Sequence, residues 1–201
     1  ANRQITDQKA KLEESHKHIS DSIQYASRIQ RALLPSEDII RRQFPNYFIY
    51  WQPRDVVSGD FYWARQVGDQ TLIAAADCTG HGVPGAFVSM LGVAFLNEIV
   101  RKGEVDTPGD VLNELRAEIK RSLGQEQNDN SVQDGMDIAF LAFNQKTGQL
   151  RFAGAHNPLI LVRQNGSEAP ELQEYKADRQ PVSAFIKEKP FTTQEVNLMP
   201  G

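Results

Sequence analysis

Apolar residues recur every seven positions along the first 34 residues, a stretch without glycine or proline that ends at Pro35. The repeating positions are Ile5, Leu12, Ile19, Ala26 and Leu33. A seven-residue repeat of this kind predicts one long helix with a coiled-coil seam. The second position of the seam is mostly polar, so the pairing energy should be modest. Over residues 1–21 we favour a dimer seam; over residues 25–34, packing of the helix on its own domain is an equal alternative.

Beyond Pro35 the pattern changes to short alternating segments with turn residues between them. Residues 37–44 predict a short amphipathic turn of helix, and Gly68-Asp69 predicts a hairpin turn. Strands are predicted at 47–52, 60–66, 70–77, 136–143, 149–153, 158–163, 172–175 and 192–198. Wider apolar stripes predict two neighbouring helices at 85–102 and 107–123, and the polar stretch 124–133 predicts a mobile loop. Strands, then two helices, then strands indicate a layered α+β fold.

Composition limits the domain count and the kinds of partner. The chain has 201 residues, of which 40 % are hydrophobic, enough for one core. We therefore expect a helical signalling or dimerisation linker at 1–34 and one catalytic domain at 35–201. A net charge of −4 gives no electrostatic reason for a nucleic-acid or anionic-membrane partner. Cys78 is the single cysteine, which excludes an intrachain disulfide and a cysteine-rich zinc site.

The chain contains no apolar window that we take for a membrane span. Its polar N-terminus lacks an initiating methionine, so we expect a piece of a longer protein. The expected location is cytoplasmic, and anchoring of the longer parent protein through upstream domains is left open.

The most informative motif is the point where the apolar run at 71–76 ends in Asp77, followed by several glycines and an amphipathic helix. A carboxylate at a strand end can ligate a hard cation, and glycines let the backbone approach an anion or take a positive φ. A second Gly59-Asp60 pair begins the preceding hairpin strand. Both carboxylates can therefore meet at one edge of a sheet, which predicts a divalent-metal site.

Several motifs in this order resemble one family. They are Ser22-Ile23-Gln24-Tyr25-Ala26, Ile29-Gln30, Leu33-Leu34-Pro35, Ser58-Gly59-Asp60-Phe61-Tyr62-Trp63, Asp77-Cys78-Thr79-Gly80-His81-Gly82-Val83-Pro84-Gly85-Ala86, Asp134-Gly135-Met136-Asp137, Gly154-Ala155-His156-Asn157-Pro158 and Asp178-Arg179-Gln180-Pro181-Val182. Together they resemble the bacterial metal-dependent serine/threonine phosphatases of the sporulation stage II E and stress-response type, within the PPM class. The resemblance covers residues 22–201. It implies an αββα sandwich, in which two antiparallel sheets are flanked by helices.

The resemblance also implies a chemistry. In this family two Mn²⁺ or Mg²⁺ ions activate a water that attacks the phosphorus of a phosphoserine or phosphothreonine. Asp60 and Asp77 correspond to metal ligands, with Asp77 bridging the ions and the backbone carbonyl of Cys78 as a further ligand. The alternative for the two acids is a turn-capping aspartate. Ligand type alone does not separate Mn²⁺ from Mg²⁺.

Three further positions are candidates for the site. His81 is a candidate proton donor to the leaving serine oxygen, and Arg54 is a candidate phosphate clamp, since a guanidinium fits phosphate oxygens. Asp137 is a candidate for metal contact through water. Each has an alternative interpretation: His81 as a loop histidine that hydrogen-bonds the backbone, Arg54 as a solvated surface arginine, and Asp137 as an aspartate that begins a strand. The turn at His156-Asn157 differs from the family in the order of the two residues before it, and it supports the fold more than a catalytic role.

Relatives continue into later aspartates that complete the metal cage, and these are missing from the sequence. We therefore expect a C-terminally truncated chain that binds metal weakly and has little or no activity by itself. The parent protein is expected to be an active hydrolase.

The resemblance implies a phosphorylated partner-switching substrate of the anti-sigma-factor antagonist type, and a homodimer through the N-terminal helix. The alternative function is a non-catalytic regulatory module that binds a phosphoprotein. A third interpretation, a helical dimerisation module with a passenger domain, leaves the Asp and Gly motifs unexplained.

Overall fold

The computed structural model describes residues 2–103, 106–125, 134–164 and 169–198. Its centre is a five-stranded antiparallel sheet with the strand order β1-β2-β3-β4-β7. These strands are β1 (Phe61–Val67), β2 (Gln70–Cys78), β3 (Met136–Asn144), β4 (Leu150–Ala155) and β7 (Gln194–Val196). A separate antiparallel ribbon consists of β5 (Leu159–Arg163) and β6 (Glu171–Tyr175).

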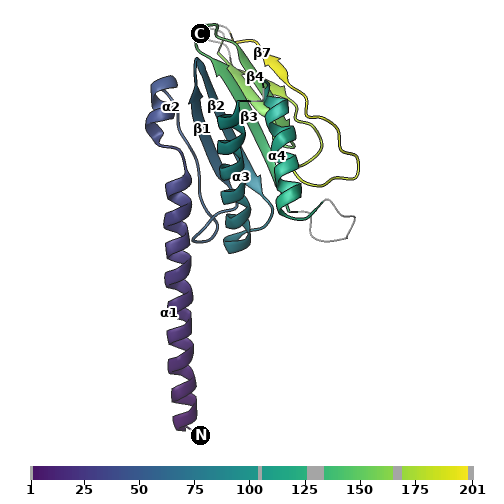
Figure 1. Ribbon diagram of the computed structural model, residues 1–201. Coiled ribbons are helices and arrows are strands. Elements are labelled where there is room, and N and C mark those ends of the chain that lie inside the picture. The colour runs from purple at the N-terminus through teal and green to yellow at the C-terminus, as the bar shows by residue number, and fades with distance from the viewer. Residues whose placement is uncertain (1, 104–105, 126–133, 165–168, 199–201) are drawn as a thin grey trace.

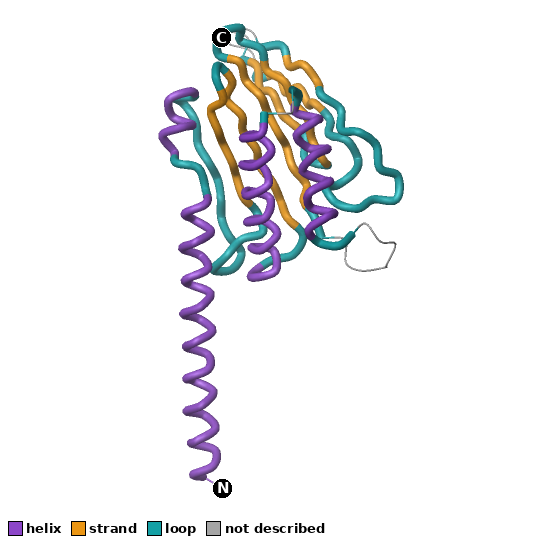
Figure 2. Tube along the Cα trace, viewed as in Figure 1, coloured by secondary structure: helices purple, strands orange, loops and turns teal. Residues whose placement is uncertain are grey.

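Two helices, α3 (Gly82–Lys102) and α4 (Pro108–Ser122), lie side by side over one face of the five-stranded sheet (Figures 1 and 2). Apolar side chains from both helices and from β1 to β4 form the core between the two layers. Its fully buried members include Leu96, Leu112, Leu115, Ile119, Ile138 and Phe140. The predicted α+β fold, with antiparallel sheets flanked by helices, is confirmed.

Alternate residues of β2 and β3 face opposite sides of the sheet, as the strand geometry requires. Cys78 and Met136 are buried on the helix-covered side. Asp77 and Asp137, which are their neighbours in sequence, therefore present their side chains on the other side. The alternation of side chains along β2 thus exposes the Asp77 carboxylate and buries the Cys78 thiol.

The N-terminal helix α1 (Asn2–Leu33) extends away from the domain, and a short helix α2 (Glu37–Gln43) follows it (Figure 1). The exposed fractions of Ile5, Leu12 and Ile19 are 62, 59 and 56 %, so the predicted seam is available to a partner. Near the other end of α1, Ser27 and Gln30 are buried. There the helix packs on its own domain, which decides between the two interpretations of residues 25–34. The dimer stays a prediction.

Some predicted boundaries were wrong. The segment 47–52 is not a strand: it is a run of mostly apolar residues, but no other segment among the described residues pairs with it. Helix α3 begins at Gly82 rather than residue 85, because Pro84 lies in the first turn, where a missing N–H costs no hydrogen bond. Strand β7 is shorter than predicted. Of the loop predicted at 124–133, residues 126–133 lie outside the described residues.

By length and apolar composition, helix α3 is the one helix of the described chain that could cross a membrane. The sequence-based expectation that no segment qualifies was therefore too strict. Half of that helix is buried against the rest of the domain. Core helices of globular domains commonly have this composition.

Candidate metal centre and active site

Three aspartates gather where β1 and β3 begin and β2 ends. Asp60 directly precedes β1, Asp77 lies one residue before the end of β2, and Asp137 is the second residue of β3. Asp77 and Asp137 are directly opposite one another in the antiparallel register. The predicted meeting of Asp60 and Asp77 at one sheet edge is present.

The carboxylates of Asp60 and Asp77 are within hydrogen-bonding reach of one another. Partial burial raises the pKa of Asp60 above its ordinary value, and the hydrogen bond and negative charge of Asp77 raise it further. Two like charges at such a separation favour a proton or a cation between them. This is the electrostatic condition of a metal site before its ion is bound.

Three glycines make this convergence possible. A Cβ atom on Gly59 would lie 2.7 Å from the carbonyl oxygen of Gly80, and one on Gly85 would lie 2.5 Å from the same oxygen. Gly80 itself has a φ of +84°, which favours glycine. The loop before Asp60, the loop after Asp77 and the start of α3 thus touch through bare backbone. Any side chain at Gly59 or Gly85 would push the two aspartates apart.

The thiol of Cys78 is not available as a ligand. Its side chain is buried in the core, and burial raises the pKa of the thiol well above its ordinary value, with further contributions from the charges of Asp77 and Asp60. The backbone carbonyl oxygen of Cys78 faces Gly59, since a Cβ atom there would lie 3.1 Å from it. Only this oxygen suits the ligand role that the sequence comparison implied.

The donors present fit a hard divalent cation as part of its coordination shell. Carboxylate and carbonyl oxygens are the ligands that Mg²⁺ and Mn²⁺ prefer. Within the described residues, however, no three His, Cys, Asp or Glu side chains are close enough to hold one ion. Asp60, Asp77 and the carbonyl of Cys78 could therefore supply only part of such a shell.

His81 forms a pair with an acid that the sequence analysis did not single out. Its Nδ1 lies 3.0 Å from Oδ2 of Asp55, and both side chains are about half exposed. Gly82, which follows, has a φ of +62°, and a Cβ atom there would lie 3.3 Å from the same Asp55 oxygen. His81 is also the N-cap residue of α3 but makes no side-chain cap bond. Its ring is thus held by Asp55 and not by the helix end.

Asp137 is paired in a similar way with the turn after β4. Its Oδ1 lies 2.8 Å from Nδ1 of His156, and its backbone carbonyl accepts a hydrogen bond of 3.1 Å from Asn157. His156 has a φ of +54°, an uncommon value for a residue other than glycine. The Asp137 carboxylate is therefore partly engaged by an imidazole. Its contact to a metal through water stays a prediction.

Arg54 is exposed and makes no hydrogen bond or ion pair with another described residue. The structure does not bring it into the aspartate cluster, so its role as a phosphate clamp stays a prediction. The sequence analysis missed its neighbour Asp55. In the sequence Asp55 is visible only as an acid five residues before Asp60. Nothing there connects it with His81, which lies 26 residues further along the chain.

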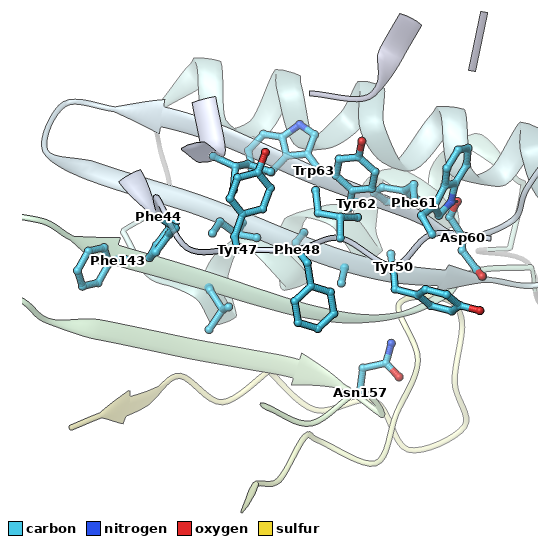
Figure 3. A pocket seen from close by; sticks show the side chains of 18 of the residues that line it. Phe44, Tyr47, Phe48, Tyr50, Asp60, Phe61, Tyr62, Trp63, Phe143 and Asn157 are labelled. Carbon is cyan, nitrogen blue, oxygen red and sulfur yellow. The ribbon is translucent and has the colours of Figure 1, made fainter. Parts of the chain in front are cut away.

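Two hollows meet at Asp77. A groove of about 720 Å³ runs along the sheet face opposite α3 and α4, with Asp60 at one end and the Phe44–Phe143 contact at the other (Figure 3). A smaller cleft of about 360 Å³ is lined by Asp77, Asp137 and His156 among others. The carboxylate cluster is therefore accessible from two sides.

Comparison with known proteins decides the family. Residues 68–201, two thirds of the chain, match the family described as Stage II sporulation protein E (SpoIIE). The chain belongs to the SpoIIE family. This places it among the PPM-class phosphatases, as the sequence motifs indicated. A search of curated protein sequences gave no significant match.

The solved structure of the SiaA-PP2C domain of Pseudomonas aeruginosa resembles this SpoIIE-family chain at 33 % identity, with a TM-score of 0.73 over 92 % of this chain and 70 % of that one. The PP2C domain of SpoIIE from Bacillus subtilis has 16 % identity and a TM-score of 0.54. The RsbU and RsbW domains of Rv1364c from Mycobacterium tuberculosis have 17 % and 0.55. The chain spans 38 % of each of the last two, and these two likenesses concern the fold alone.

Proposed function

We propose that this chain is the phosphatase domain of a bacterial signalling protein that hydrolyses phosphoserine and phosphothreonine in a metal-dependent reaction. The observation that carries the proposal is the contact between the Asp60 and Asp77 carboxylates on the edge of the sheet. The repulsion between two such carboxylates lowers the stability of the folded protein unless a cation lies between them. Membership of a phosphatase family supports the same conclusion.

Asp60, Asp77 and the carbonyl of Cys78 are the groups that would hold Mn²⁺ or Mg²⁺, two ions by analogy with the family. When bound, such ions lower the pKa of a coordinated water and neutralise charge on the phosphoryl group. The protein supplies rigid placement of these oxygens through the contacts of Gly59, Gly80 and Gly85.

His81 is proposed to assist the departure of the serine or threonine oxygen. The carboxylate of Asp55 accepts a hydrogen bond from Nδ1–H and so orients the ring, and the imidazolium form carries a further proton on Nε2. The bond between phosphorus and the leaving oxygen breaks, and that oxygen takes the Nε2 proton. Arg54, exposed beside Asp55, is proposed to bind phosphate oxygens.

The substrate is proposed to be a small phosphoprotein of the anti-sigma-factor antagonist type, in the cytoplasm. The dimer is proposed to form through the exposed seam of α1, at Ile5, Leu12 and Ile19. Nucleic acid is not an expected partner, because the chain carries a net charge of −4.

The alternative function, a regulatory module that binds a phosphoprotein without hydrolysis, is favoured by one observation. The described residues provide only an incomplete metal shell. The deciding experiment is hydrolysis of a phosphoserine peptide with Mn²⁺ or Mg²⁺, by this chain and by a longer one with ~40–60 further C-terminal residues. Turnover that is lost in Asp77→Ala supports the enzyme. Peptide binding without turnover in both forms supports the module.

A further inference from the structure

A buried glutamine connects the N-terminal helix to the loop before Asp60. The side-chain amide of Gln30, on α1, is only 3 % exposed. Its Oε1 accepts a hydrogen bond of 3.0 Å from the backbone N–H of Ser58, and its Nε2 donates one of 2.5 Å to the backbone carbonyl of the same residue. The Ser58 backbone is therefore held on both its donor and its acceptor, as a neighbouring strand would hold it.

The same amide reaches the first helix of the core. Nε2 of Gln30 also donates a hydrogen bond of 2.8 Å to Oγ of Ser89 on α3, and that hydroxyl lies 3.2 Å from the Ser58 carbonyl oxygen. Ser58 and Ser89 are 4 % and 1 % exposed. In such a dry site each lost partner leaves a buried polar group unsatisfied, so the three residues act as one network.

The network ends at the candidate metal ligand. The backbone N–H of Asp60 donates a hydrogen bond of 3.0 Å to the Ser58 hydroxyl. Between these two residues lies Gly59, whose backbone touches the Gly80 loop. Gln30 therefore restrains the peptide two residues before Asp60, and Ser58 restrains Asp60 itself.

Little else on α1 can do this. Among residues 3–33 only Ser27 and Gln30 have buried side chains. An apolar residue would suffice to attach the helix to the domain, whereas the amide matches both the backbone N–H and the backbone carbonyl of Ser58. The contact is thus specific for the position of the loop.

We propose that Gln30 is a positioning residue that fixes the Asp60 carboxylate for metal binding and couples α1 mechanically to the metal centre. The proposal rests on the proposed function of Asp60 as a ligand. A change in the position of α1, through its exposed seam, then changes the metal affinity through Ser58.

The test is a pair of matched variants on the same helix. Gln30→Met keeps the length and volume of the side chain but removes its three hydrogen bonds, and Gln24→Met makes the same change at an exposed position. The first readout is Mn²⁺ affinity by isothermal titration calorimetry. The second is amide hydrogen exchange of residues 55–62 in the metal-free protein.

For Gln30→Met we expect Mn²⁺ affinity to fall by about tenfold or more, the effect typical of outer-shell partners, and exchange at Ser58 and Asp60 to accelerate. Gln24→Met should match the wild type in both. Unchanged affinity and exchange in a folded Gln30→Met protein would overturn the proposal. If that variant does not fold, Ser89→Ala, which removes one acceptor of the amide, should give smaller changes in the same direction, and no change would count against us.

The two proposals fail separately. If the wild type binds no Mn²⁺, the function proposed for Asp60 is wrong. Hydrogen exchange then decides on Gln30 alone: faster exchange in Gln30→Met supports its hold on the loop, and unchanged exchange contradicts it.

Discussion

Asp60 and Asp77 lie at the open end of one hairpin, and their carboxylates are within hydrogen-bonding reach of one another. In the metal-free protein this proximity is unfavourable, because the negative charge of Asp77 disfavours ionisation of Asp60. Under the proposed function, the arrangement exchanges some stability of the metal-free form for affinity toward a cation. Three of the predictions below test parts of this statement.

Asp77→Asn should stabilise the metal-free chain while removing its response to metal. The repulsion of two unit charges at ~4 Å in water is about 1 kcal/mol, which corresponds to a Tm about 2–4 °C higher for a domain of this size. Thermal unfolding with a chelator and then with Mn²⁺ measures both effects. The prediction would be contradicted if Asp77→Asn had a lower Tm than the wild type in the chelator, or if Mn²⁺ raised the Tm of the variant as much as it raises that of the wild type.

The metal-free stability should fall as pH rises above the ordinary pKa of Asp60, 3.8. The folded chain raises this pKa, so it binds the proton more tightly than the unfolded chain does, and the corresponding stability is lost as pH rises through the folded value. Asp60→Asn removes this titration. The Tm difference between Asp60→Asn and the wild type should therefore grow from about pH 4 to pH 7 in the presence of a chelator. A constant difference would refute the assignment.

Gly59→Ala should separate the two carboxylates. The new Cβ would lie 2.7 Å from the Gly80 carbonyl oxygen, and such overpacking typically costs about 1–3 kcal/mol. Mn²⁺ binding should be lost with it. Gly68→Ala is the control: its site is open, and its φ of +56° makes the substitution cost about 1–2 kcal/mol without touching the metal centre. Calorimetric titration of both variants distinguishes them, and equal Mn²⁺ affinities would argue against the glycine contact.

His81→Ala and Asp55→Asn should affect substrates according to their leaving group. A serine oxygen needs a proton as it departs, whereas p-nitrophenolate does not, so hydrolysis of a phosphoserine peptide should slow by about 10²-fold or more in His81→Ala. Asp55→Asn should act in the same direction, since it removes the negative charge beside Nδ1. Turnover of p-nitrophenyl phosphate should change little, measured in a form of the protein that is active on both substrates. Equal losses on the two substrates would mean that the pair does not donate the proton.

Much of the fold could be predicted because its signals are local. The hairpin of β1 and β2 follows from two apolar segments on either side of Gly68-Asp69. Helix α4 begins directly after its N-cap Thr107, whose hydroxyl accepts a hydrogen bond from the N–H of Asp110. The convergence of Asp60 and Asp77 follows from the same hairpin, because each lies at the open end of its strand.

The rest of the site depends on contacts between distant segments. The pairing of Asp55 with His81 is set by the glycine contacts between two loops, and the pairing of Gln30 with Ser58 by the docking of α1. Neither has a periodic pattern in the sequence. The prediction of a strand at 47–52 failed for a related reason: a run of apolar residues suits a strand, but a strand also requires a neighbouring strand to pair with.

Titration of Mn²⁺ into the metal-free chain by isothermal calorimetry, with Asp77→Ala beside the wild type, tests the central claim most directly. We predict saturable binding to the wild type that is weak, because the described residues provide only part of a coordination shell, and no measurable binding to Asp77→Ala. An absence of binding to the wild type, or equal binding to both proteins, would contradict a metal centre at Asp60 and Asp77.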